Sequence, residues 1–92
     1  MKKAAKLIVQ GTTQGFFFRQ FIKENSESLN LKGFVRNLNN GDLEVIVEGE
    51  NYSIDKLEKI LRRGPKHSNI RNVIREEKKW TGDFLDFKIL RF

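Results

Sequence analysis

Residues 31–49, with the sequence LKGFVRNLNNGDLEVIVEG, contain two extended segments separated by a turn. The segments 31–38 and 43–49 are rich in β-branched and other apolar residues, which is typical of strands. Between them lies Asn39-Asn40-Gly41-Asp42, and an Asn-Gly pair favours the positive φ values that a type I′ hairpin turn requires. This stretch therefore predicts an antiparallel hairpin.

An amphipathic helix is predicted on each side of this hairpin. From Phe17 onward, apolar residues recur at helical spacing, with charged and polar residues between them: Phe18, Phe21, Ile22 and Leu29. A second apolar stripe of the same spacing follows the hairpin: Ile54, Leu57, Ile60 and Leu61. Asn51 or Ser53 can cap the start of the second helix, and Gly64 with Pro65 should end it. Each helix thus has one apolar stripe, which is suited to covering a sheet.

The outer segments add strands to this pattern. Residues 4–11 form a short segment with β-branched residues and are predicted to be the first strand. Residues 70–77 are a further strand candidate. Leu85, Phe87 and Ile89 alternate with polar residues, which predicts a last strand. The order favours an α+β, ferredoxin-like βαββαβ sandwich with an additional C-terminal strand. Both helices should pack on one face of an antiparallel sheet, and we expect residues 1–92 to form a single domain.

Composition excludes several classes of protein. The chain has 92 residues, 18 Lys+Arg against 12 Asp+Glu, a net charge of +6 and no cysteine. Without cysteine there is no disulfide framework, thiol nucleophile or cysteine-ligated metal centre. No apolar run approaches the roughly 18 residues of a membrane span, and the basic N-terminus is followed by too short an apolar run for a signal peptide. We expect a cytoplasmic protein without a membrane partner, and a monomer.

Residues 14–19, Gln-Gly-Phe-Phe-Phe-Arg, lie where the first strand passes into the first helix. A turn that leads into a helix gathers free backbone N–H groups at the positive end of the helix dipole, which suits a phosphate. Arg19 can bind two phosphate oxygens side by side through its planar guanidinium. The alternative is that Gly15 only permits a turn and that Arg19 is a solvated side chain.

Residues 33–37, Gly-Phe-Val-Arg-Asn, form the second informative stretch. A carboxamide at the end of a strand can accept a hydrogen bond from a water and donate one to a substrate oxygen, so Asn37 can position a nucleophilic water. The alternative is that Asn37 bonds locally beside the hairpin turn, as asparagines near turns often do.

Taken together, these stretches resemble the acylphosphatase family. The family's loop signature, Gly-x-Val-Gln-Gly-Val-Gly-Phe-Arg, is similar to GTTQGFFFR at 11–19, and its Gly-x-Val-Arg-Asn signature is similar to GFVRN at 33–37. The turn and strand at 40–45, Glu-Gly at 48–49 and Gly-Pro at 64–65 also look matched. The resemblance covers nearly the whole chain.

The resemblance implies a hydrolase that cleaves the carboxyl–phosphate bond of acyl phosphates to a carboxylate and inorganic phosphate, with no metal or other cofactor. It makes Arg19 the phosphate-binding residue and Asn37 the residue that orients the attacking water. Backbone N–H groups from Gly15 to Arg19 complete the cradle, and the implied substrate-binding residues are Gln14, Gly15, Phe16, Phe17 and Phe18. An acyl phosphate already has a good leaving group, so catalysis can rest on positioning and charge stabilisation. Transfer of the water's proton to a phosphate oxygen of the substrate is a hypothesis.

The sequence departs from the family pattern in the loop, where Thr13 replaces valine and Phe16-Phe17 replaces Val-Gly. A positive φ at Phe17 would cost roughly 1 to 2 kcal/mol. With a negative φ the ring can point outward and only the backbone N–H matters, so we expect a working loop. Phe16 and Phe17 can also wall the site around an acyl group, although adjacent phenylalanines more often serve packing or interfaces.

Two other functions remain as alternatives. A catalytically silent domain would follow if the altered loop no longer accommodates phosphate. A module that binds nucleic acid or another anion is suggested by the net charge and by the basic residues Arg62, Arg63, Lys66, Arg71, Arg75, Lys78 and Lys79. Lys32-Gly33-Phe34 resembles the start of an RNA-recognition motif, but residues 35–38 do not continue that motif. A nucleic acid is therefore the less favoured partner. His67, the only histidine, is expected in a loop without a catalytic role.

Overall fold

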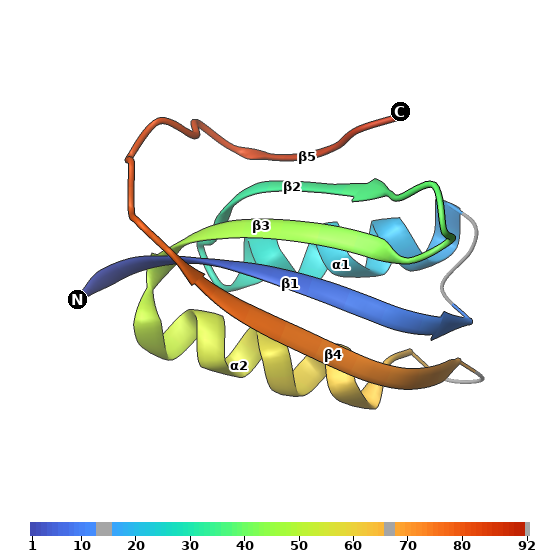
Figure 1. Ribbon diagram of the computed structural model, residues 1–92. Helices are drawn as coiled ribbons and strands as arrows, with labels where there is room; N and C mark the ends of the chain where they lie inside the picture. Colours follow the sequence, from blue (N-terminus) through green and yellow to red (C-terminus); the bar gives the residue numbers. More distant parts are fainter. Residues whose placement is uncertain (13–15, 66–67, 92) are drawn as a thin grey trace.

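The computed structural model describes residues 1–12, 16–65 and 68–91 of the chain. Its elements are β1 (Lys2–Thr12), α1 (Phe16–Ser28), β2 (Lys32–Asn37), β3 (Leu43–Glu50), α2 (Asn51–Arg63), β4 (Asn69–Lys78) and β5 (Phe87–Ile89). The strands form one five-stranded sheet in the order β4-β1-β3-β2-β5, and both helices cover the same face of it (Figure 1). The predicted ferredoxin-like βαββαβ sandwich with an additional C-terminal strand is confirmed. In this part of the chain no helix is long and apolar enough to cross a membrane.

The prediction of a wholly antiparallel sheet is wrong at one edge. β1 pairs antiparallel with β3 and β4, and β2 pairs antiparallel with β3, but β5 pairs parallel with β2. The chain leaves β4 at one edge, crosses the sheet and reverses direction before it reaches the other edge (Figure 1). β2 runs antiparallel to β4. A strand that reverses direction after β4 and then joins β2 must therefore run parallel to β2.

The hairpin turn is also different from the predicted type I′. Gly41 has φ 92°, but Asn30 is the only residue other than glycine with a positive φ in the described part of the chain, so Asn40 does not adopt one. The Gly41 N–H donates to the Leu38 carbonyl at 3.0 Å, and the Leu38 N–H donates to the Asp42 carbonyl at 2.8 Å. These bonds belong to a three-residue loop in which only the last residue needs a positive φ, and glycine fills that place.

The core lies between the sheet and the two helices. Buried residues from α1 (Phe18 and Ile22) and from α2 (Ile54, Leu57 and Leu61) join alternate residues of the strands in one cluster. The predicted end of α2 is confirmed, because the Gly64 N–H donates to the Ile60 carbonyl at 2.9 Å. The predicted start is not, because the N-cap is Glu50 and no side chain caps it. The apolar stripes and Gly64 therefore predicted the helices correctly, whereas the predicted N-cap residues were wrong.

Candidate active site

The two predicted catalytic residues, Arg19 and Asn37, lie on different elements whose ends meet at one side of the molecule. α1 begins with Phe16 where β2 ends with Asn37, and α1 packs against β2 and β5 (Figure 1). Side chains alternate along a strand, so Asn37 lies on the helix-facing side with the buried Val35. Arg19 and Asn37 line the same cleft of ≈ 380 Å³, together with Phe16, Ile89, Leu90 and Arg91.

The cleft is electropositive. Within residues 1–12, 16–65 and 68–91, no hydrogen bond or ion pair joins the guanidinium of Arg19 or Arg91 to another group. The described residues that line the cleft include these two guanidinium groups and no carboxylate. Unpaired guanidinium groups in a concave site favour an anion that can accept paired hydrogen bonds. The cleft is therefore suited to a phosphate group.

The start of α1 contributes to the same electropositive end. The first N–H groups of an α-helix have no acceptor within the helix, and in α1 these include the N–H groups of Phe16, Phe17 and Phe18. The first turn of α1 contains no acidic residue that would compete for them. The positive end of the helix dipole thus lies beside Arg19.

Among the described residues, the Asn37 side chain forms no local hydrogen bond beside the hairpin turn, contrary to the alternative interpretation. The hairpin turn is held by Asn40, whose side-chain Oδ1 accepts the Asp42 N–H at 3.0 Å and whose Nδ2 donates to Asp42 Oδ2 at 3.2 Å. The carboxamide of Asn37 has no hydrogen-bond partner among the described residues. It is exposed at the cleft, where it is available to a water or a substrate.

The predicted substrate-binding residues are distributed unevenly. Gln14 and Gly15, like Thr13, lie outside the described residues. Phe16 lines the cleft with 56% of its surface exposed, whereas Phe18 is 4% exposed and belongs to the core. Phe17 is 77% exposed, does not line the cleft and has no positive φ, so its bulk imposes no backbone strain of that kind. Of the three phenylalanines at 16–18, only Phe16 presents its ring to the cleft.

Sequence reasoning missed the contribution of the C-terminal segment to the cleft. Ile89, Leu90 and Arg91 reach it because β5 pairs with β2, and the Leu90 N–H donates to the Val35 carbonyl at 2.9 Å. The available signal was the alternation of Phe87 and Ile89, which places Arg91 on the same side as these apolar residues if the extended conformation continues. The pairing partner of the last strand had to be known before this signal pointed to the cleft.

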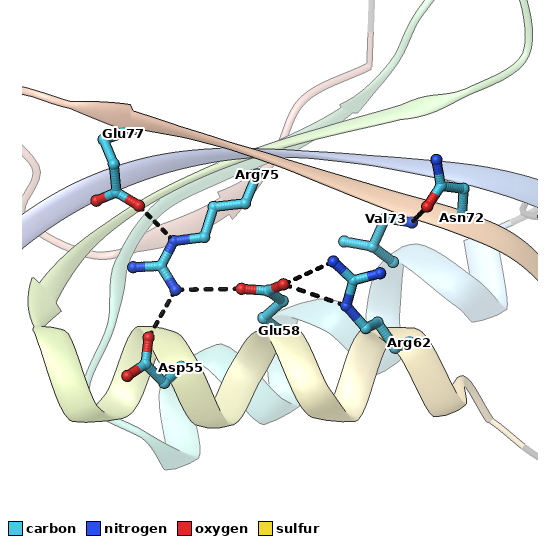
Figure 2. Close-up of polar contacts among 7 residues, drawn as sticks. All are labelled: Asp55, Glu58, Arg62, Asn72, Val73, Arg75 and Glu77. Atoms are coloured by element: carbon cyan, nitrogen blue, oxygen red, sulfur yellow. Dashed lines mark hydrogen bonds and ion pairs between the residues drawn. The ribbon is translucent and has the colours of Figure 1, made fainter.

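Several of the basic residues that suggested a nucleic-acid binder are neutralised by neighbours. Arg75 on β4 bonds Asp55 and Glu58 of α2 at 2.6 and 3.1 Å, and Glu58 also accepts from Arg62 (Figure 2). Lys78 pairs with Glu76 at 3.1 Å. Lys66 and His67 lie outside the described residues. These pairs join α2 to the sheet and leave Arg62, Arg75 and Lys78 less available to a polyanion.

The geometry of Glu58 also explains its ionisation. Burial opposes the charge on this carboxyl group, but hydrogen bonds from Arg62 and Arg75 outweigh that effect, so the pKa of Glu58 is lowered. Burial opposes the charge on Arg75 as well, but hydrogen bonds to Asp55, Glu58 and Glu77 raise the pKa of its guanidinium. The cluster therefore holds β4 against α2 while Glu58 and Arg75 are both charged.

Comparisons with known proteins find similarity over nearly the whole chain. A model of the Acylphosphatase family matches residues 5–89. A curated acylphosphatase of Syntrophus aciditrophicus is 36% identical over 90 residues, covering 98% of this chain and 94% of that protein. One from Helicobacter hepaticus is 38% identical over 96 residues, covering 99% of this chain and 100% of that protein. The solved structure of an acylphosphatase from Coxiella burnetii superposes with a TM-score of 0.89 at 36% identity, over 97% of this chain and 93% of that one.

Proposed function

The chain belongs to the acylphosphatase family, and we propose that Arg19 and Asn37 are the residues with which it hydrolyses acyl phosphates. One observation carries the proposal. The two side chains come from α1 and β2, line one electropositive cleft, and are both unpaired within the described part of the chain. Residues 1–92 then act as one catalytic domain. Both groups come from a single chain, which supports a monomeric enzyme.

Arg19 binds the phosphate of the substrate in this proposal. Its guanidinium donates to two phosphate oxygens, and the free N–H groups at the start of α1 donate to the others. Gln14 and Gly15 of the preceding loop, together with the backbone of residues 16–18, complete the cradle. Each of these donors strengthens as charge moves onto the phosphate oxygens in the transition state.

Asn37 positions the attacking water. The water oxygen forms a bond to phosphorus while the bond from phosphorus to the acyl oxygen breaks, and the electron pair of that bond leaves with the carboxylate. The water's proton passes to a phosphate oxygen, giving inorganic phosphate. None of the described residues that line the cleft is an aspartate, glutamate or histidine, which supports proton transfer to the substrate itself. The rate then comes from positioning and charge stabilisation.

The decisive experiment measures the hydrolysis of benzoyl phosphate in the presence of EDTA. Arg19→Ala and Asn37→Ala are compared with Arg63→Ala and Asn39→Ala, which remove exposed side chains of the same types away from the cleft. We expect the first two variants to lose at least about a hundredfold in kcat and the second two to match the parent chain. Folding is checked by circular dichroism, and the monomer by sedimentation velocity.

Two results would contradict the proposal. A folded parent chain that releases no phosphate would favour the catalytically silent domain. Full activity in Arg19→Ala or Asn37→Ala would show that the assigned roles are wrong even though the chain is active.

A further inference from the structure

A second hollow continues the cleft along the surface. It has a volume of ≈ 450 Å³ and lies between α1 and β5. It shares Phe16, Ile89 and Arg91 with the cleft, but neither Arg19 nor Asn37 is among the described residues that line it. We call this second hollow the acyl groove. Both hollows fall within the range of about 300 to 1,000 Å³ typical of sites for small ligands.

The acyl groove extends from the cleft on the side of the phosphate where the leaving group must lie. In a displacement at phosphorus the attacking and leaving oxygens lie roughly in line on opposite sides of the phosphoryl group. With the phosphate on Arg19 and the water held by Asn37, the acyl group lies on the side of the phosphate away from Asn37. Passing from the cleft to the acyl groove leads away from Asn37, because only the cleft is lined by it.

An apolar surface stands at the junction of the two hollows. Phe16 is the first residue of α1, and 56% of its surface is exposed. Ile89 is half-buried beside the core on the β5 side of the same junction. The more distant wall is polar and includes the Lys23–Glu27 ion pair of 2.9 Å. A group attached to the phosphate therefore meets apolar side chains first.

We propose that Phe16 and Ile89 form an acyl subsite that makes this chain select acyl phosphates with an aromatic or bulky apolar acyl group. The inference rests on the proposed function and names its substrate class. A flat ring placed against Phe16 removes apolar surface of both groups from water and allows ring stacking. The methyl group of an acetyl phosphate removes little, so it gains little from the subsite.

Phe16 and Phe17 provide a matched pair of variants. Both are exposed phenylalanines in the first turn of α1, but only Phe16 lines the cleft and the acyl groove. The measurement is the ratio of kcat/KM for benzoyl phosphate to kcat/KM for acetyl phosphate. Each variant's ratio is compared with that of the parent chain, so the intrinsic difference in reactivity between the substrates cancels.

We expect Phe16→Ala to lower kcat/KM for benzoyl phosphate about tenfold and that for acetyl phosphate less than about twofold. Phe16→Leu, which keeps an apolar side chain, should fall between the parent and Phe16→Ala. Phe17→Ala should keep the parent ratio, and Tyr52→Ala, which removes an exposed ring on α2, controls for general effects. An unchanged ratio in Phe16→Ala, or an equal change in Phe17→Ala, would overturn the proposal.

A binding measurement separates this proposal from the proposed function. Phenacylphosphonate and acetonylphosphonate replace the bridging oxygen of benzoyl and acetyl phosphate by a CH₂ group and cannot be hydrolysed at that position. We expect phenacylphosphonate to bind the parent chain about tenfold more tightly, and Phe16→Ala to abolish this difference. A chain that hydrolyses neither substrate but shows this difference would contradict the proposed function alone. Equal binding of the two phosphonates, or no binding of either, would overturn the acyl subsite.

Discussion

Glu48 on β3 accepts hydrogen bonds from both the backbone N–H and the hydroxyl of Thr81, at 2.9 and 2.8 Å. The Gly82 N–H adds a third at 2.9 Å. Thr81 and Gly82 belong to the connection that carries the chain from β4 across to β5 (Figure 1). Glu48 is 5% exposed, and these three donors compensate for the burial of its carboxyl group. A buried carboxylate in the sheet thus holds the segment that delivers Ile89 and Arg91 to the cleft.

Glu48→Ala should therefore affect both stability and the site. We expect a loss of about 2 kcal/mol in the free energy of unfolding, because the donors of Thr81 and Gly82 lose their acceptor. We also expect faster amide exchange in residues 83–90, measured by hydrogen exchange and mass spectrometry. Glu50→Ala, which removes an exposed carboxyl group from the same strand, is the control. Equal exchange in the two variants would contradict the role of Glu48 as the anchor of this connection.

The ion-pair cluster around Arg75 gives a prediction for stability without a change in activity. The Arg75 side chain is 17% exposed and bonds groups on α2 and on its own strand (Figure 2). The cleft is lined in part by β5, which lies at the opposite edge of the sheet. Arg75→Ala should lower the free energy of unfolding by about 2 kcal/mol, because Glu58 is left half-buried without one of its two partners. Urea denaturation measures this loss. A fall in kcat of the folded variant would show that the cluster is coupled to the site.

Acid should weaken the same cluster. The pKa of Glu58 is lowered from its ordinary value of 4.5 in the folded chain, as hydrogen bonds from Arg62 and Arg75 outweigh the opposing effect of burial. The contribution of the charged carboxylate to stability is therefore complete above pH 4.5 and is lost as the pH falls through the lower folded value. Glu58→Gln should be less stable than the parent chain by about 1 kcal/mol at neutral pH. The difference should shrink in strongly acidic urea titrations, and a difference independent of pH would contradict this origin.

Local patterns in the sequence predicted most of the fold. The apolar stripes of α1 and α2 and the alternation in the strands depend on residues a few positions apart, so their spacing identified the elements. The pairing of β5 with β2 depends on where a connection from the far edge of the sheet arrives, and no local pattern encodes it. The local motifs that carry the family resemblance predicted Arg19 and Asn37 as a pair. Arg91 could not be connected with them, because that required knowing that β5 pairs with β2. The turn differs from type I′ because the Asn40 side chain bonds Asp42 while Gly41 alone takes the positive φ.

Arg91 supplies the last prediction, because its guanidinium lines the cleft without a partner among the described residues. A second positive charge near the phosphate attracts a doubly negative substrate and its transition state about equally, so it should lower KM without raising kcat. Arg91→Ala should raise KM for acyl phosphates about fivefold with kcat nearly unchanged, and Arg91→Lys should recover most of the loss. Raising the salt concentration from about 0.01 M to about 1 M should reduce the difference between parent and Arg91→Ala, since the range of the charge falls from about 30 to about 3 Å. A large fall in kcat instead would mean that Arg91 contacts the reacting atoms, as we propose for Arg19.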